Sequence, residues 1–390
     1  MRKLFLVVCI SFLSLPGRSI NVKIQLFNEQ RISAVSLICH GSYQLYTGHD
    51  SKAYVIEEGE NNSFEINRCE KGIRIIAGEK IIGEFISAEF VPKNSECTFT
   101  LSDFDTKKST LLLEDGVQLK AENNFLRIIN LVNLEHYVAD VMVCEVGKNK
   151  QVEFLKAKAI ICRTYAMGSK LRHLPDSDLL CTNVHCQVYK GKQGVTPQIL
   201  EAVRSTENQF ISAKNNQFII AAFHSNCGGR TQNSEDAWSS ALPYLRAVED
   251  TYCLHQPHAT WELKIPLSSW NKYMDKIPDE PLSISVKAES GNVASGARQK
   301  YDVYKNKKIL TQKLRNDWNL KSTWFTISEK NDSLLFSGRG YGHGVGLCQE
   351  GAMNMSERGY SCERIIKFYY KDVNIIKLSP AEMTNILHGN

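Results

Sequence analysis

The sequence predicts an α+β protein with a β-rich N-terminal part and a mixed α/β core that contains a substrate cleft. Residues 20–133 hold many short apolar segments separated by glycine and polar turns, a pattern typical of strands. From residue 134 onward, apolar residues recur at intervals of three and four, which is typical of helices packed on a core. The expected divisions are a leader at 1–19, a β-rich region at 20–133, the first half of the core at 134–262, a variable subdomain or insertion at 263–330, and a glycine-rich loop with C-terminal helices that completes the core at 331–390.

Composition narrows the classes of function. The chain has 390 residues, of which 43% are hydrophobic and 23% charged, and this is enough apolar material for two or three domains. Its net charge of +5 suits approach to an anionic cell wall or membrane surface. No run of lysine and arginine with interleaved aromatic residues occurs, so a nucleic-acid partner is disfavoured.

The first residues have the form of a secretory leader. Arg2 and Lys3 precede the apolar run LFLVVCISFLSL, and the turn-forming segment PGRS follows it. The run is short for a transmembrane helix, but no clear small-x-small cleavage pattern follows, so both cleavage and retention as an N-terminal anchor stay open. We expect an exported protein of the periplasm or cell envelope.

Within the β-rich region, residues 111–119 (LLLEDGVQL) predict a hairpin, because Asp115-Gly116 suits a tight turn with positive φ. Residues 125–132 predict a further strand that leads directly into Leu134. No catalytic cluster is evident before that point.

A helix over residues 134–145 would place Leu134, Val138, Val141 and Glu145 on one face. A carboxyl group in such an apolar setting loses hydration, and its pKa then rises, which is the condition for a general acid. The alternative is an ordinary glutamate at a helix end, held by a cap or a salt bridge. The spacing alone does not separate the two.

The next helix is predicted over residues 151–170, with a narrow buried seam. The seam consists of Val152, Leu155, Ala159, Cys162 and Ala166. Arg163 and Tyr165 flank it, and they either point into a cleft or make contacts on the helix surface.

Residues 173–191 carry a candidate metal site. His173, Cys181, His185 and Cys186 are ligand types that zinc prefers, although the Cys181–Cys186 spacing is wider than in a zinc-ribbon knuckle. A local disulfide explains the two cysteines equally well. The chain has twelve cysteines, and an odd number remains without Cys9 of the leader, which allows disulfides, a metal site and at least one free thiol.

Several loops carry polar side chains that suit sugar binding. Gln187 and Tyr189 can hydrogen-bond sugar hydroxyls or acetamides, or else pack the loop. Residues 218–223 (FIIAAF) predict an apolar strand that ends in the polar turn 224–231, where paired glycines allow a ligand to approach the backbone. His224 and Cys227 lie too close in sequence for a typical thiol-protease pair. Trp238 can border a sugar site, and residues 263–330 carry no motif.

Glycines at every second position from 338 to 346 mark the last informative stretch. The Gly-Lys-Ser/Thr of a P-loop is missing, and so is the spacing of a dinucleotide-binding motif. On an extended backbone, Arg339, Tyr341 and His343 would share one face. Residues 349–358 predict a helix stopped by Gly359, and Ser361 is expected to cap the next one.

Taken together, these segments resemble the SpoIID family, which comprises stage II sporulation protein D and related amidase-enhancer proteins. The likeness covers roughly residues 22–372, and the order of its motifs makes it specific. The matching elements are Leu134-Glu135-His136-Tyr137, Glu145, Lys156-Ala157-Lys158-Ala159, Arg163-Thr164-Tyr165-Ala166, Gln187-Val188-Tyr189-Lys190-Gly191, Ser225 to Thr231, Pro243-Tyr244-Leu245 and Gly338 to Gly346. The family's Pro-Ser before the glutamate is Val143-Cys144 here, and Cys227 and Cys348 replace small residues.

The resemblance implies a lytic transglycosylase that acts on peptidoglycan glycan strands and leaves 1,6-anhydro ends. Glu145 would serve as the single general acid and base. The residues expected to bind substrate are Arg163, Tyr165, Gln187, Tyr189, Ser225, Arg339, Tyr341, His343 and Gln349. Some members of the family carry zinc near the Gln-Val-Tyr element, which favours one structural zinc ion at His173, Cys181, His185 and Cys186 over a disulfide. Besides glycan strands, an amidase or another cell-wall enzyme is an expected partner.

Two other functions stay open at this point. One is a non-catalytic amidase enhancer that binds peptidoglycan with the same fold. The other is a zinc hydrolase that uses His173, Cys181 and Cys186 with an open coordination position.

Overall fold

The computed structural model describes residues 20–28, 30–48, 50–59, 62–104, 109–147, 150–168, 179–183, 186–238, 240–278, 298–304, 307–379, 381–383 and 385. The predicted leader at 1–19 lies outside this part, and so do His173 and His185 of the expected metal site. Across the described ranges, no helix is both long enough and apolar enough to span a bilayer. The structure has extensive sheets and helices, so the predicted α+β class is confirmed.

The N-terminal part consists of two sheets. The first has the order β13 (Leu179–Cys181), β1 (Asn21–Leu26), β12 (Phe125–Asn133), β11 (Gly116–Glu122), β8 (Ser87–Pro92), β3 (Tyr43–Thr47) and β4 (Asp50–Ile56). The second has the order β10 (Thr110–Glu114), β9 (Thr98–Asp103), β2 (Ala34–His40), β5 (Ser63–Cys69), β6 (Gly72–Ala77) and β7 (Lys80–Phe85). Neighbouring strands are antiparallel except β1 and β13. Apolar side chains from both sheets share one core, in which the Phe64 and Phe90 ring centroids lie 5.2 Å apart.

The hairpin predicted over residues 111–119 is wrong. β10 pairs with β9, whereas β11 pairs with β12 and β8, so the chain passes from one sheet to the other at Asp115. Asp115 does adopt a positive φ of 62°, as the turn pattern predicted. Its carboxylate accepts hydrogen bonds from the Asn133 backbone N–H at 2.8 Å and lies 2.9 Å from the His136 ring. These long-range contacts select a change of sheet over a local hairpin.

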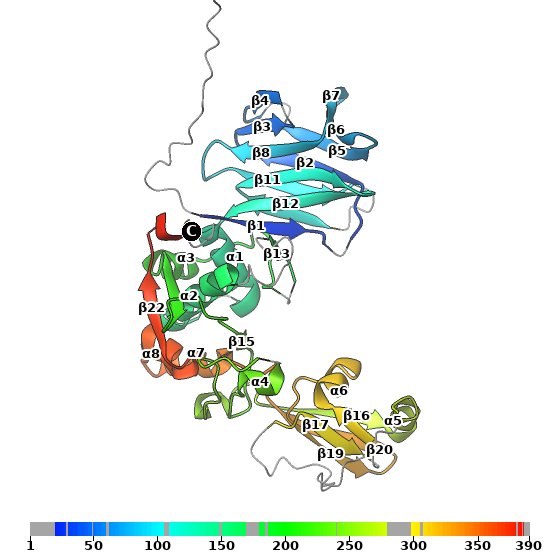
Figure 1. The fold of residues 1–390 in the computed structure, drawn as a ribbon, viewed down its shortest axis with the longest axis vertical. Helices are drawn as coiled ribbons and strands as arrows, with labels where there is room; N and C mark the ends of the chain where they lie inside the picture. Colours follow the sequence, from blue (N-terminus) through cyan, green and yellow to red (C-terminus); the bar gives the residue numbers. More distant parts are fainter. Residues whose placement is uncertain are drawn as a thin grey trace, which may run out of the picture.

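A helical core follows directly from β12 (Figure 1). It contains α1 (Leu134–Val146), α2 (Val152–Gly168), α3 (Pro197–Ser205), α7 (Gln349–Glu357) and α8 (Cys362–Tyr369). Two short strand pairs, a short helix and a 3₁₀ turn complete it: antiparallel β14 (Gln209–Ala213) and β22 (Val373–Lys377), parallel β15 (Phe223–His224) and β21 (Leu347–Cys348), α4 (Ser234–Ala237) and η2 (Thr251–Cys253). Asn133 begins α1, because its side chain accepts a hydrogen bond from the Glu135 N–H at 2.8 Å.

Helix α2 is buried more completely than predicted. Helices α1, α3, α7 and α8 and strand β14 all pack against it. Phe154, Lys158 and Arg163 are therefore buried along with most of the predicted seam, whereas Val152 at its start is 43% exposed. The predicted seam was too narrow, because the sequence pattern records only apolar residues and misses polar side chains that are buried in the core, such as Lys158 and Arg163.

Other local predictions have mixed outcomes. Ser361 caps α8 by accepting a hydrogen bond from the Arg364 N–H at 3.4 Å, and Gly359 follows α7 with a φ of 82°, so both helix signals are confirmed. Of the strand predicted over residues 218–223, only Phe223 lies in a named strand, as the first residue of β15. Its preceding residues turn instead, since the Ala222 N–H bonds to the carbonyl of Ile220 at 2.8 Å.

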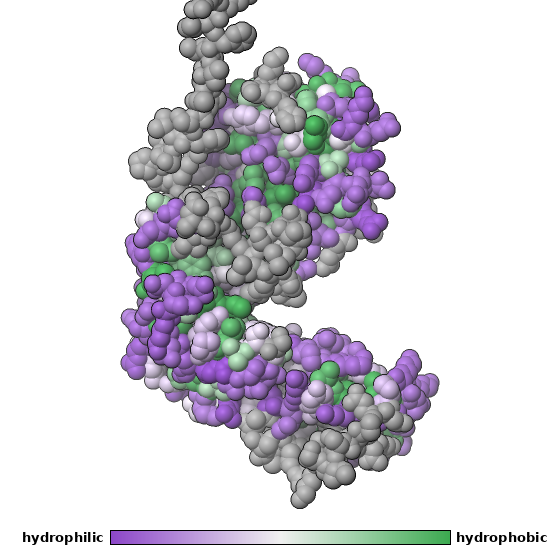
Figure 2. All heavy atoms as spheres, in the orientation of Figure 1, coloured by the Kyte–Doolittle hydropathy of each residue, from purple (hydrophilic) through white to green (hydrophobic). Residues whose placement is uncertain are grey.

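A second hydrophobic core lies in residues 260–339. It contains an antiparallel sheet of order β16 (Thr260–Pro266), β20 (Ser333–Arg339) and β19 (Phe325–Lys330), with α5 (Leu267–Met274), α6 (Thr311–Asp317) and the pair β17 (Tyr301–Tyr304) and β18 (Lys307–Leu310). Trp270, Leu314 and Phe336 are fully buried in this core. In Figure 1 this subdomain lies at the opposite end of the helical core from the β-rich part, and Figure 2 shows an open notch between the two ends.

The glycine-rich segment is not extended after β20. Gly340, Gly342, Gly344 and Gly346 all have positive φ values, between 71° and 111°. Residues other than glycine rarely adopt a positive φ, which explains why glycine occupies every second position here. The prediction that Arg339, Tyr341 and His343 share one face is therefore wrong for Arg339.

Candidate functional site

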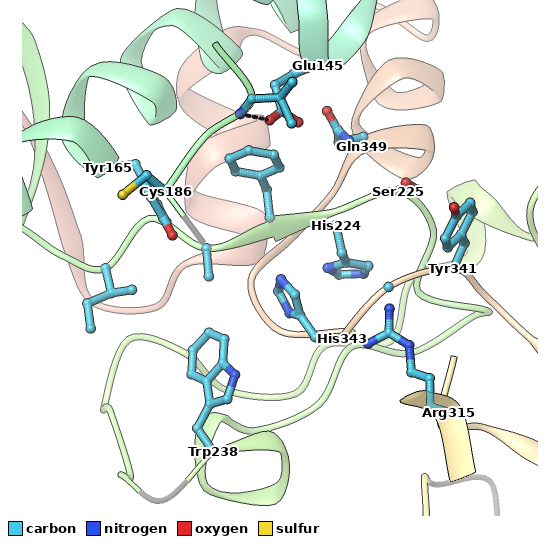
Figure 3. Close-up of a pocket in the computed structure, with 15 residues that line it drawn as sticks. Glu145, Tyr165, Cys186, His224, Ser225, Trp238, Arg315, Tyr341, His343 and Gln349 are labelled. Atoms are coloured by element: carbon cyan, nitrogen blue, oxygen red, sulfur yellow. Dashed lines mark hydrogen bonds between the residues drawn. The ribbon is translucent and has the colours of Figure 1, made fainter. Parts of the chain in front are cut away.

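A pocket opens where the helical core meets the subdomain (Figure 3). It is lined by Glu145, Tyr165, Cys186, Val188, Ile220, Ala222, Phe223, His224, Ser225, Trp238, Arg315, Tyr341, Gly342, His343 and Gln349. Its cavity volume is about 250 Å³, close to the lower end of the range of ligand pockets. Of the residues expected to bind substrate, the pocket brings together Tyr165, Ser225, Tyr341, His343 and Gln349 around Glu145.

Glu145 is half-buried in the last turn of α1. Leu134, Val138 and Val141 are buried on the face predicted from the sequence, and Glu145 continues that face into the pocket. Its Oε1 accepts a hydrogen bond from the Val188 N–H at 3.0 Å. Within the described part of the chain, no lysine or arginine forms an ion pair with Glu145, so the salt-bridge alternative does not describe its setting.

Gln187 and Tyr189 lie outside the pocket, on either side of Val188. Tyr137 Oη donates to Gln187 Oε1 at 3.2 Å, and Tyr189 Oη donates to Asn130 Oδ1 at 2.8 Å. Both side chains are buried. They anchor the backbone that donates to Glu145, and this placement does not fit the direct sugar contacts expected from the sequence.

Arg163 also lies away from the pocket. Its Nε and Nη2 donate to the Glu135 carboxylate at 2.9 and 2.6 Å, and further bonds reach the carbonyls of Gln209 and Val203. The side chain is fully buried. The expected role of Arg163 in substrate binding is therefore corrected to a structural one, whereas Tyr165, two residues on, reaches the pocket from another face of α2.

Two histidines at the centre of the pocket are neutral at neutral pH. Burial lowers the pKa of His343 to about 4, aided by the charges of Arg298 and Arg315, and lowers the pKa of His224 well below its usual value. His224 Nδ1 donates to the Val345 carbonyl at 3.1 Å, so in the neutral ring Nε2 carries the lone pair. In the described structure, that buried Nε2 has no hydrogen-bond partner.

Gln349 provides a second unused acceptor. It lies at the start of α7 with 8% exposure, and within the described residues its Oε1 accepts no hydrogen bond. Trp238 forms the opposite wall, with its ring 5.4 Å from His343. The pocket therefore combines apolar aromatic surface with two buried acceptors that match hydroxyl or amide N–H donors.

Arg339 was expected to bind substrate but lies outside the pocket, whereas Arg315, to which the sequence assigned no role, lines it. Arg339 is exposed and lines a separate groove beside Trp261 and Thr326. Arg315, in the segment that carried no motif, enters the pocket from α6. Nothing in the sequence TQKLRNDW distinguishes Arg315 from a surface arginine, because its contact with the pocket depends on how the subdomain packs.

The structure describes only part of the loop that is expected to bind zinc. Cys181 and Cys186 are both buried, and the Cys181 N–H lies 3.4 Å from Cys186 Sγ. Cysteine sulfurs are ligands that zinc prefers, so this pair of residues is compatible with a soft-metal site. His173 and His185 lie outside the described residues, so the four-ligand set stays a prediction.

Comparison with known proteins adds to this geometry. A family model described as "SpoIID: Stage II sporulation protein" matches residues 122–212, a range that includes Glu145 and Val188. An uncharacterized protein of Brachyspira hyodysenteriae is 30% identical over 264 residues, which cover 65% of this chain and 69% of that protein. The chain belongs to the SpoIID family.

Relatives within the SpoIID family carry two kinds of name. The stage II sporulation protein D of Bacillus subtilis is 29% identical over 302 residues, covering 72% of this chain and 85% of that protein. The amidase enhancer of the same organism is 28% identical over 281 residues, covering 58% of this chain and 38% of the enhancer. The resemblance inferred from the motifs is thus confirmed.

Proposed function

We propose that this SpoIID-family protein is an exported peptidoglycan lytic transglycosylase that uses Glu145 as its single general acid and base. Family membership supports a cell-wall-related function. The observation that carries the finer proposal is the composition of the pocket: among the described residues that line it, Glu145 is the single carboxylic acid. A hydrolase would normally use a second carboxylate, as base or nucleophile.

The reaction needs one proton carrier. The Glu145 carboxyl donates its proton to the glycosidic oxygen, and the bond between that oxygen and C1 of N-acetylmuramic acid breaks with its electron pair on the leaving oxygen. The carboxylate then takes the proton of the C6 hydroxyl, whose oxygen bonds to C1 and closes the anhydro ring. The attacking hydroxyl is tethered to the sugar, so its effective concentration exceeds that of an untethered nucleophile.

Val188 supports this role by orienting the carboxyl group. Its N–H occupies Glu145 Oε1, which leaves Oε2 to carry the proton toward the substrate. The buried anchors Gln187 and Tyr189 hold Val188 on both sides. The Gln-Val-Tyr element therefore affects catalysis through the backbone N–H of Val188.

The rest of the pocket suits an acetylated sugar. His224 Nε2 and Gln349 Oε1 accept hydrogen bonds from hydroxyl or acetamide N–H groups, and Trp238 offers an apolar face for a sugar ring. Arg315 is the single arginine or lysine in the described lining, and it suits the lactyl carboxylate of muramic acid. That carboxylate is free only where the stem peptide has been removed, so we expect a preference for denuded strands.

Product analysis tests the proposal. Purified protein is incubated with denuded glycan strands and the products are analysed by mass spectrometry. We expect 1,6-anhydromuramyl ends, which carry no added water and resist borohydride reduction. Reducing ends heavier by one water would support the zinc hydrolase instead. Intact strands with folded, bound protein, followed by release of peptides when an amidase is added, would support the enhancer function named for one relative.

A further inference from the structure

Behind the pocket wall, four side chains converge that the proposed mechanism does not use. The Sγ atoms of Cys227, Cys253 and Cys348 and a carboxylate oxygen of Asp250 all lie within 4.8 Å of one another, and all four residues are buried. Cys227 Sγ is 3.3 Å from Cys253 Sγ and 3.2 Å from Asp250 Oδ2. This group is separate from the zinc loop expected at Cys181 and Cys186.

We propose that these residues bind one structural Zn²⁺ ion through three thiolates and the Asp250 carboxylate. Zinc prefers four ligands in a tetrahedron, and thiolate-rich sets select it over hard cations. With zinc–sulfur bonds of about 2.3 Å, a tetrahedron separates its sulfurs by roughly 3.8 Å. The Cys227–Cys253 sulfur separation of 3.3 Å is about half an ångström shorter, and all four ligand atoms lie within 4.8 Å of one another, so binding needs only small side-chain adjustments. Four protein ligands close the coordination sphere, which is typical of structural rather than catalytic sites.

Surrounding groups orient the proposed ligands. The N–H groups of Cys227 and Gly351 donate to Cys348 Sγ at 3.2 and 3.4 Å. Tyr369 Oη donates to Asp250 Oδ2 at 3.0 Å, and the Tyr252 N–H donates to Oδ1 at 3.0 Å. Hydrogen bonds of this kind fix ligand direction in known metal sites. A Cβ at Gly351 would lie 2.4 Å from Asp250 Oδ2, so the helix can approach the carboxylate only with glycine there.

Charge near the cluster is also suitable. Three thiolates and a carboxylate leave two negative charges after zinc binds. The buried guanidinium of Arg298 donates to the Cys227 carbonyl at 2.9 Å, which brings a cation beside the cluster. Helix α7 begins next to Cys348, so its N-terminal N–H groups also face the negative charge. A disulfide would use two of the three cysteines and leave the third thiol and Asp250 unexplained.

The ligands join three segments of the chain, two of which border the pocket. Cys227 lies two residues after Ser225, Cys348 directly precedes Gln349, and Asp250 caps the η2 turn that contains Cys253. A bound ion would hold Ser225 and Gln349 in position while leaving Glu145 on α1 untouched. Loss of the ion should therefore lower thermal stability and glycan affinity together.

The test separates this site from the Cys181 loop. Metal is measured by elemental analysis in a Cys181→Ser, Cys186→Ser background, and we expect about one zinc per chain. Adding Cys253→Ser should abolish that zinc, whereas the control Cys362→Ser, outside the cluster, should retain it. A background protein that is folded but free of metal would overturn the proposal.

A second measurement uses the wild-type protein and does not depend on how variants fold. Peptide-resolved alkylation is compared before and after treatment with a chelator. We expect chelation to expose Cys227, Cys253 and Cys348 to the reagent, and buried Cys39 in the β-rich part to stay unchanged. Equal protection with and without chelator, or a disulfide between any two of the three cluster cysteines, would overturn the proposal.

Discussion

Helix α2 and the pocket wall both bury polar side chains, but Arg163 of the helix and two side chains of the wall differ in how far their hydrogen-bonding capacity is used. Arg163 in α2 is fully buried and bonds to the Glu135 carboxylate and to two backbone carbonyls. His224 and Gln349 in the pocket wall each keep a buried acceptor that no described residue uses. A buried polar group without a partner lowers stability, so such groups persist where a ligand completes them.

The comparison shows that residues of one sequence motif can divide between scaffold and site. Arg163 and Tyr165 are two positions apart on α2, yet only Tyr165 reaches the pocket. Likewise, Gln187 and Tyr189 are buried anchors, while Val188 between them touches Glu145. The side-chain oxygens of Gln187 and Gln349 differ in the same way, since only that of Gln187 has a donor within the described protein, and the following variants test that difference.

The largest effect is expected from Glu145→Gln. The amide keeps the shape and the bond from Val188 but cannot donate and retake a proton. We expect glycan cleavage to fall by about three orders of magnitude or more, with unchanged thermal unfolding. The matched control is Glu201→Gln on the exposed face of α3, which should cleave normally. Near-normal cleavage by the Glu145 variant would remove it from the mechanism.

The next effect concerns the scaffold. Arg163→Met leaves the Glu135 carboxylate without its partner inside the protein, so we expect the free energy of unfolding to fall by about 3–5 kcal/mol. Denaturant titration measures this. The double variant Arg163→Met, Glu135→Leu should recover a large share of the loss, since no charge is then left unpaired. A stable Arg163 variant with weakened glycan binding would instead return Arg163 to the substrate site.

A smaller effect compares two buried glutamines. Gln349→Met removes an unused acceptor from the pocket, and we expect glycan affinity to fall about 5- to 10-fold, as one hydrogen bond implies, with no loss of stability. Gln187→Met is the matched control, because its Oε1 serves Tyr137 Oη. It should lower stability and leave affinity unchanged. Calorimetry of binding and thermal unfolding together distinguish the pair, and identical behaviour would contradict the division between scaffold and site.

The last comparison concerns Asp140, a scaffold group whose hydrogen-bonding capacity is only partly used. Asp140 accepts one bond, from the Gln193 N–H at 3.3 Å, and burial raises its pKa from 3.8 to about 8, with the Glu114 charge adding to the effect. Between those pH values the folded protein keeps a proton that the unfolded chain has released, so stability falls as pH rises. Asp140→Asn should remove this loss. Unfolding measured from pH 4 to 8 should therefore show the variant gaining relative to wild type, and parallel curves would refute the assignment.

The sequence by itself determined the features that depend on neighbouring residues. The class of fold, the helices at 134–146 and 152–168, the stop at Gly359 and the cap at Ser361 follow from periodicity and local hydrogen bonds. The placement of Glu145 on the face of Leu134 and Val138 follows from helix geometry. These patterns depend on residues that lie within one or two helical turns of each other, so a short stretch of sequence includes every residue that takes part.

Tertiary structure alone decided the features that join distant segments. The change of sheet at Asp115 depends on Asn133, and the burial of Arg163 depends on Glu135 across 28 positions. The pocket gains Arg315 from another subdomain, and Cys227 meets Cys348 across 121 positions. Local patterns cannot encode these contacts, because the partner, exposure and charge of each side chain are set by the segments that pack against it.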